Sequence, residues 1–217
     1  MTFTDHRPAA ISAATAPTGW YASGGKRAVD LVITVPLLVV LSPVLLLAGL
    51  ALRIKLGPGI VLRQERIGRN AETFSMLKFR TMEHSRRNGP PDLWDGTDRR
   101  TGHKSDSDPR HTQLGRMLRK FSVDELPQLI NIVKGDMSLV GPRPQMAAVA
   151  SPSFRAHPRH QIRPGLTGPF QVSPLRAGGN LDAGLEIDAD YVETLTLRSD
   201  IKFLFGTFSA LVGGTGS

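Results

Sequence analysis

Two adjacent carboxylates, Asp124 and Glu125, are the residues of this basic chain whose types and spacing most clearly suggest chemistry. Neighbouring like charges raise each other's pKa unless a cation lies close by. Such carboxylates can bind Mg²⁺ beside a diphosphate, and one of them can attack phosphorus as a nucleophile. The pair therefore predicts phosphoryl chemistry, with both carboxylates as metal ligands.

Arginines accompany the acidic pair along the chain. Arg119 lies five residues before Asp124, Arg143 stands between two prolines, and Arg163 precedes a Pro-Gly pair. Arginines held rigidly are suited to bidentate binding of phosphate. These three residues are therefore candidate substrate-binding residues for a phosphorylated ligand.

Helix capping is an alternative explanation for the acidic pair. Ser122-x-x-Glu125 matches a capping box, and Asp124 could itself be the N-cap, with Pro127 in the first turn. The apolar residues that follow fall on one helical face, and Gly135 supplies a stop signal. From the residues alone, chemistry and capping both stay open.

The element that would place this site at a membrane is an uncharged stretch over residues 31–52. Its length is enough to cross a hydrocarbon core of ~30 Å. However, Ser42-Pro43 lies at its middle and basic residues flank both ends, which favours keeping both ends in the cytoplasm. We therefore expect a re-entrant helix-break-helix hairpin over residues 26–56, in which the Ser42 hydroxyl bonds a carbonyl that Pro43 leaves unpaired. A kinked spanning helix and a buried core helix are the alternatives.

The remaining pattern predicts an α+β fold that is mostly helical. Residues 60–68 and 73–82 alternate apolar and polar side chains and predict a small β-hairpin, in which Lys78 and Arg80 could simply be the wet face of a strand. The other expected segments are a long loop over 83–113, short helices over 113–120 and 188–197, proline-rich loops over 141–174, and an apolar helix over 201–212. This last helix suits a membrane interface, with a core helix as the alternative.

Composition limits the classes of partner. The chain has 217 residues, with 27 Lys and Arg against 19 Asp and Glu, which favours an anionic partner. It has no cysteine, and aromatic residues make up only 6%, so thiolate sites are excluded and base stacking on nucleic acid is not expected. We expect a flexible lead over 1–25, the membrane helix over 26–56 and a membrane-surface catalytic domain over 57–217. A non-catalytic adaptor that binds acidic lipid is the main functional alternative.

The stretch DELPQLINIVKGDMSLVGPRP, with KFRTM before it and RPGLTG after it, resembles the bacterial sugar transferase family, the monotopic phosphoglycosyl transferases, in their compact form. The resemblance covers about residues 25–208. It implies that Asp124 attacks the sugar-bearing phosphate of a UDP-sugar in the presence of Mg²⁺ and releases UMP. The phosphosugar would then pass to a polyprenyl phosphate, while Glu125 holds the metal or positions the acceptor.

The same resemblance implies a phosphate site and a cellular location. The matching phosphate-site residues are Lys78, Arg80, Arg119 and Arg143. The implied partners are a UDP-sugar, a polyprenyl phosphate such as undecaprenyl phosphate, and membrane lipid; a homodimer stays open. The implied location is the cytoplasmic face of the bacterial inner membrane, where exopolysaccharide or glycoconjugate assembly begins. Departures from the family pattern at Ile130, at Pro169-Phe170 and at Thr194-Leu195 bear on sugar choice and packing rather than on the chemistry.

Overall fold

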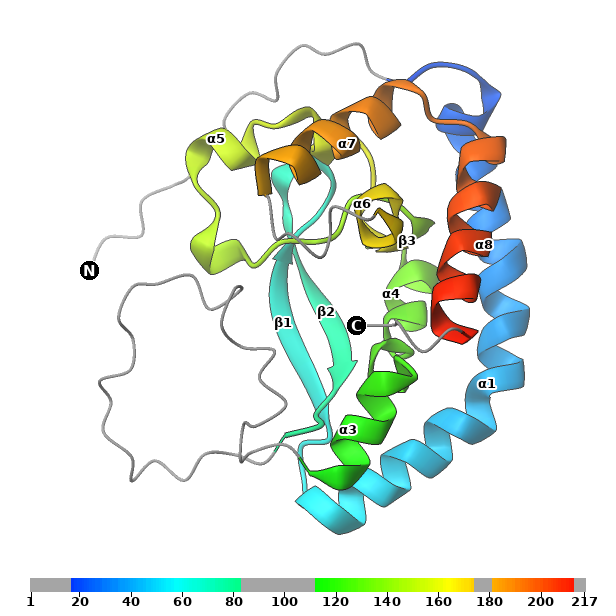
Figure 1. Cartoon of the computed structure of the whole chain (residues 1–217), viewed down its shortest axis with the longest axis vertical. Coiled ribbons are helices and arrows are strands. Elements are labelled where there is room, and N and C mark those ends of the chain that lie inside the picture. Colours follow the sequence, from blue (N-terminus) through cyan, green and yellow to red (C-terminus); the bar gives the residue numbers. More distant parts are fainter. Residues whose placement is uncertain (1–16, 83–111, 174–180, 213–217) are drawn as a thin grey trace.

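The computed structural model describes residues 17–82, 112–173 and 181–212, and it has the expected α+β, mostly helical architecture (Figure 1). Its core joins α1, α4, α7 and α8 around side chains such as Leu129, Ile132 and Val192. The main elements are α1 (Lys26–Leu56), β1 (Val61–Ile67), β2 (Thr73–Phe79), α3 (Gln113–Lys120), α4 (Gln128–Lys134), β3 (Ser138–Val140), α5 (Pro152–Arg155), β4 (Gly165–Thr167), α6 (Pro169–Val172), α7 (Leu181–Glu193) and α8 (Leu197–Val212).

The predicted β-hairpin is confirmed, and helix α4 packs against the outer edge of its second strand. Strands β1 and β2 pair antiparallel, with Gln64 opposite Met76. The side-chain amide of Asn131 on α4 accepts from the Leu77 amide at 2.9 Å and donates to the Ser75 carbonyl at 2.8 Å. Asn131 thus satisfies edge groups that a third strand would otherwise pair, and it fixes α4 beside β2.

Helix α1 runs without interruption through both of its prolines and bends partway along its length (Figure 1). Pro43 lacks the N–H that would bond to the carbonyl of Val39, and the Ser42 hydroxyl donates to that carbonyl at 2.7 Å. The expected serine compensation is therefore confirmed. In place of two helices separated by a break, the structure has one bent helix, and its placement in a membrane stays a prediction.

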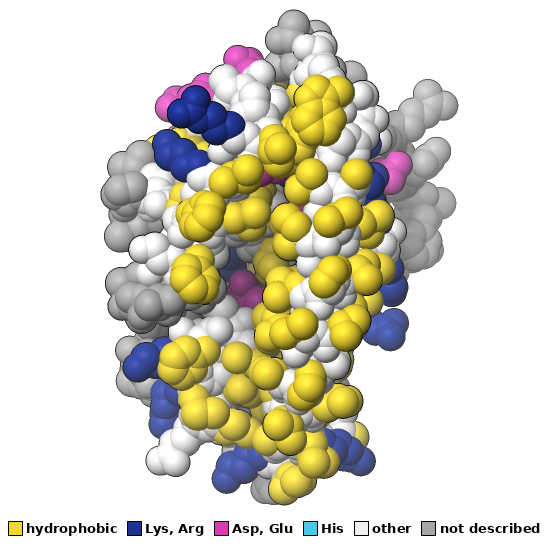
Figure 2. Space-filling view, turned by 90° about the vertical axis from the view of Figure 1, so that its right-hand side faces the viewer, with side chains coloured by type: hydrophobic (Ala, Val, Ile, Leu, Met, Phe, Trp, Pro, Cys, Tyr) yellow, Lys and Arg dark blue, Asp and Glu magenta, His cyan; other side chains and the backbone are white. Residues whose placement is uncertain are grey.

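Both ends of α1 pack against the same folded body. Near its start, Asp30 accepts hydrogen bonds from Ser138 and from the Leu139 amide, both at 3.0 Å. Near its end, Leu52 is fully buried in a cluster with Phe79 and Leu118. Between these anchors the outer side of the helix is apolar and exposed (Figure 2), including Val32, Val39, Val40, Leu46, Leu47 and Leu50.

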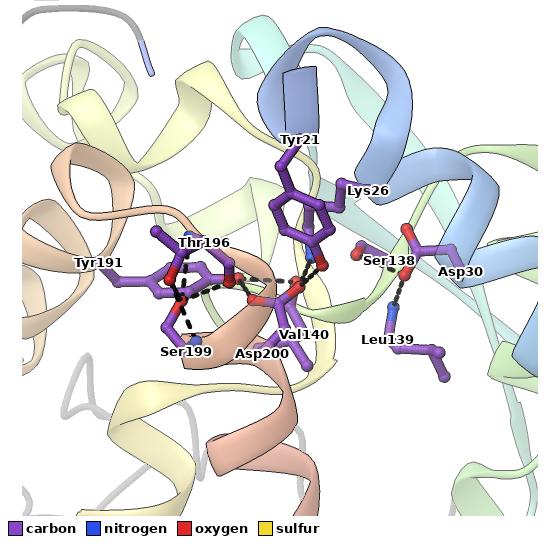
Figure 3. A network of polar contacts seen from close by, with 10 residues as sticks. All are labelled: Tyr21, Lys26, Asp30, Ser138, Leu139, Val140, Tyr191, Thr196, Ser199 and Asp200. Atoms are coloured by element: carbon purple, nitrogen blue, oxygen red, sulfur yellow. Dashed lines mark hydrogen bonds and ion pairs between the residues drawn. The ribbon is translucent and has the colours of Figure 1, made fainter. Parts of the chain in front are cut away.

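A buried carboxylate, Asp200, ties the start of α1 to α8 (Figure 3). Its oxygens pair with the Lys26 ammonium at 2.5 Å and accept from the hydroxyls of Tyr21 at 2.6 Å and Tyr191 at 2.5 Å. Tyr21 lies in a helical turn, Tyr21–Gly25, so the expectation of a flexible lead up to residue 25 is wrong at this end. The reason is that the Tyr21 hydroxyl is anchored in the core by Asp200.

Other expectations need smaller corrections. Helix α7 begins at residue 181 rather than 188, and α8 begins at 197 rather than 201. The proline-rich segment 141–174 also contains β4, which pairs parallel with β3, a two-stranded sheet that the sequence pattern did not indicate. Residues 83–111 of the expected long loop lie outside the part of the chain that the structure describes.

Candidate active site

The acidic pair does not cap helix α4. Asp124 and Glu125 lie in a short 3-10 turn, Val123–Glu125, between α3 and α4. Ser122 adopts a left-handed conformation with φ 53° and its side chain makes no capping hydrogen bond; the residue at the N-cap of α4 is Pro127. The capping interpretation is therefore wrong.

The two carboxylates meet a lysine from the β-hairpin. The Lys78 ammonium lies 2.8 Å from Oδ2 of Asp124 and 3.3 Å from Oε1 of Glu125. Asp124 is only 2% exposed, whereas the Glu125 side chain keeps 22% of its surface. Asn131 fixes α4 to β2 at Leu77. Lys78 follows Leu77 in the strand and therefore lies close to the turn that precedes α4.

Opposing effects act on the Asp124 carboxyl. Burial raises its pKa above the ordinary value and is the largest effect, Lys78 and Arg119 act to lower it, and the charge of Glu125 raises it further. A carboxylate that is stripped of water, and whose ionised form an adjacent ammonium favours, has the character of an activated nucleophile. Arg119, in the last turn of α3, therefore belongs to the electrostatic surroundings of Asp124.

Arg143 reaches the other carboxylate from a proline-flanked loop. Its NH2 nitrogen lies 3.6 Å from Oε1 of Glu125, and its side chain is 55% exposed. The loop is braced by the RPGLTG stretch, since the Gly165 amide donates to the Pro142 carbonyl at 3.0 Å. A Cβ added to Gly165 would lie 2.1 Å from the Gly141 nitrogen, so both glycines are needed for this close approach of backbones.

A pocket opens beside this cluster, between the β-hairpin, the start of α4 and the Arg143 loop. Polar side chains make up much of its wall. The predicted site residues did not include its two glutamines, one on β1 and one at the start of α4, because a neutral amide lacks the charge that singled out the acidic pair and the arginines. The pocket residues that bear on the chemistry are Gln64, Lys78, Glu125, Gln128 and Arg143.

Two of the predicted phosphate-binding arginines make their described contacts elsewhere. The Arg80 guanidinium donates to the Leu56 carbonyl at 2.6 Å, at the C-terminal end of α1. The Arg163 guanidinium donates to the Gly135 carbonyl at 2.7 Å, at the end of α4 away from the acidic pair. Both contacts neutralise helix C-termini. Phosphate binding by Arg80 and Arg163 stays a prediction.

The donor set at the acidic pair suits Mg²⁺. Mg²⁺ prefers carboxylate oxygens, keeps several waters and commonly takes its remaining ligands from substrate phosphates. Asp124 and Glu125 supply two such groups, and Glu125 borders the pocket. Among the described residues, no group of three or more His, Asp or Glu side chains could hold a metal ion.

Comparison with known proteins finds relatives that match most of the chain. The chain is 40% identical over 197 residues to the UDP-glucose:undecaprenyl-phosphate glucose-1-phosphate transferase of Caulobacter vibrioides, covering 86% of this chain and 69% of that protein. It is 36% identical to the exopolysaccharide production protein ExoY of Sinorhizobium fredii, covering 88% and 87%. It is 31% identical to the UDP-N-acetylgalactosamine-undecaprenyl-phosphate N-acetylgalactosaminephosphotransferase of Aeromonas hydrophila, covering 88% and 44%.

A protein-family model also matches most of the chain. The model described as bacterial sugar transferase matches residues 21–214, which include the acidic pair, Lys78 and Arg143. This chain therefore belongs to the bacterial sugar transferase family.

Proposed function

We propose that this enzyme transfers a sugar 1-phosphate from a UDP-sugar to a polyprenyl phosphate, and that Asp124 is the nucleophile. The observation that carries the proposal is the buried Asp124 carboxylate, paired at 2.8 Å with Lys78 beside a polar pocket. The printed names of the Caulobacter and Aeromonas relatives give UDP-sugars and undecaprenyl phosphate as substrates of those proteins.

In the first step, an oxygen of Asp124 forms a bond to the sugar-bearing phosphorus of the UDP-sugar. The bond from that phosphorus to the bridging oxygen breaks, and UMP leaves with the bridging oxygen and the electron pair. Lys78 favours the ionised form of the carboxylate before attack, while Arg143 can neutralise phosphate oxygens. Mg²⁺ held by Asp124 and Glu125 would neutralise the diphosphate and stabilise charge on the leaving group.

In the second step, a phosphate oxygen of the lipid attacks the same phosphorus. The bond to Asp124 breaks, the carboxylate is restored, and a polyprenyl diphosphosugar is formed. Glu125 lies at the pocket wall, where it can orient the incoming lipid phosphate through its neighbours Lys78 and Arg143.

The proposed membrane placement is a re-entrant helix at the cytoplasmic surface. One described helical span, Tyr21–Leu56, is long and apolar enough to cross a membrane. Both of its ends pack on one body, and a simple spanning helix would leave one end on the far side without that packing. The exposed apolar face that α1 shares with α8 has a hollow with acidic and basic side chains at its floor (Figure 2), and the apolar surface around the hollow suits contact with lipid.

The test is release of UMP from a panel of UDP-sugars by detergent-solubilised protein, with Mg²⁺ and undecaprenyl phosphate. We expect turnover with one or a few sugars and its loss in Asp124→Asn, with membrane association unchanged. If Asp124→Asn kept most of its turnover, Asp124 would not be the nucleophile. The adaptor alternative, for which the named transferase relatives give no support, would release no UMP with any sugar.

A further inference from the structure

A buried ion pair lies outside the acidic site and has no role in the chemistry described above. Arg159 and Asp188 come from a 3-10 turn and from α7, and their NH2 and Oδ2 atoms are 3.0 Å apart. Their side chains are only 5% and 2% exposed. Burying two charges is costly even when they are paired, so an ion pair this deep is poorly explained by stability alone.

The pair is connected to the Arg143 loop through a single guanidinium nitrogen. The NH2 atom of Arg159 that meets Asp188 also donates to the backbone carbonyl of Arg143 at 2.6 Å. An NH2 nitrogen carries two hydrogens, so it can serve both acceptors at once. The next carbonyl along the loop, that of Pro144, accepts from Arg66 at 3.3 Å. Arginines therefore hold two successive carbonyls of the loop.

The loop needs this kind of support because prolines flank Arg143. Pro142 and Pro144 have no N–H, so the backbone can be fixed there chiefly through its carbonyl oxygens. The Arg143 side chain is more than half exposed and meets Glu125 at 3.6 Å, which is too loose a contact to set its position. The direction in which Arg143 projects therefore depends on where its backbone is held.

We propose that Arg159 and Asp188 are positioning residues, which hold the Arg143 backbone so that its guanidinium faces the pocket and binds a substrate phosphate. Asp188 keeps the Arg159 guanidinium charged and oriented, and Arg159 transmits that orientation to the Arg143 carbonyl. This inference rests on the proposed function, because it assigns Arg143 to the nucleotide-sugar phosphates. It also predicts that loss of either partner acts through Arg143 alone.

The test is a double-mutant cycle on KM for the UDP-sugar, with Arg143→Ala, Asp188→Asn and the double variant. A charge-assisted hydrogen bond typically contributes ~1.5 kcal/mol or more, so we expect each single change to raise KM about tenfold with little change in kcat. The double variant should be no worse than Arg143→Ala alone, because Asp188 acts through the missing side chain. Multiplied effects in the double variant, or a normal KM in Asp188→Asn, would overturn the proposal.

A second variant and a matched control complete the experiment. Arg159→Lys serves as the test variant if Asp188→Asn does not fold. It keeps a charge beside Asp188 but loses the planar guanidinium that reaches both acceptors, so it should show the same rise in KM. Arg155→Ala removes a neighbouring arginine that donates to the Ala147 carbonyl at 3.2 Å, and it should leave KM unchanged. Equilibrium binding of UDP needs no turnover and should show the same non-additive loss, so failure of this inference is distinguishable from failure of the proposed function.

Discussion

At the scale of single residues, Lys78 favours the ionised form of the proposed nucleophile. It lowers a pKa that burial and Glu125 raise, so Lys78→Met should raise the pKa of Asp124 further. The acid limb of the kcat/KM profile should then move to higher pH, because only the ionised carboxylate attacks. Profiles of the two proteins measured in parallel check this, with Lys134→Met, at the far end of α4, as the control expected to keep the original limb. An unmoved limb in Lys78→Met would contradict the role given to Lys78.

A second prediction at this scale concerns His160, which is buried and hydrogen-bonded to the Phe154 carbonyl at 3.1 Å. Burial, together with the charge of Arg159, lowers the pKa of His160 to about 4. The unfolded chain takes up a proton near the ordinary value while the folded chain resists it, so stability is lost as the pH falls from about 6.5 towards about 4. The free energy of unfolding should drop by about 2 kcal/mol from this residue between about pH 7.5 and pH 5.

Denaturant unfolding of wild type and His160→Gln at both pH values measures this contribution. Glutamine does not titrate in this range, so the variant should lose less stability on acidification than the wild type. Equal losses in the two proteins would show that His160 is protonated as easily in the folded state as in the unfolded one.

The sequence indicated the residues of the candidate site better than it indicated the residues that support them. Asp124, Glu125, Lys78 and Arg143 come together as the motif resemblance implies. Supports such as Arg159 have no motif, because a buried pair with Asp188 depends on contacts between segments distant in the sequence. In the same way, the partner of Lys26 is Asp200, which lies 174 residues away in the sequence.

At the scale of elements, α3 must approach the end of the β-hairpin closely in order to carry Arg119. Gly115 makes this approach possible, since a Cβ there would lie 2.0 Å from the Thr81 carbonyl oxygen. Gly115→Ala should therefore displace α3, lower stability by about 1–3 kcal/mol and reduce turnover. Gly206→Ala, whose Cβ would make ordinary contacts of 3.5 Å or more, is the matched control.

Thermal unfolding and UMP release of both glycine variants decide the point. The control should be neutral or slightly stabilising, because alanine favours a helix more than glycine does. If Gly115→Ala were as stable and active as the control, the contact between α3 and the hairpin would not matter for the site.

Local pattern was sufficient for elements whose periodicity is strong and whose ends are marked. Helix α3 has the predicted bounds, and α4 ends at Gly135 in a left-handed conformation with φ 95°. Strands β3 and β4 were missed because each spans three residues and their pairing joins distant segments. The start of α7 was predicted seven residues too late.

At the scale of the whole molecule, the account depends on both ends of α1 lying on one side of the membrane. The chain has no cysteine, so single cysteines at Thr18 and Pro58 report on the two ends without interference. We expect neither position to react with an impermeant maleimide added to intact cells, and both to react after lysis. Labelling of either position from outside would establish a spanning helix.

The central claim, that Asp124 becomes covalently bonded to a phosphosugar, is tested most directly by mass spectrometry of the protein incubated with its UDP-sugar and Mg²⁺ but without polyprenyl phosphate. We expect a mass increase of one phosphosugar on the peptide that contains Asp124, its disappearance when undecaprenyl phosphate is added, and its absence in Asp124→Asn. A fully active protein that never carries this adduct, or that carries it on another residue, would contradict the account.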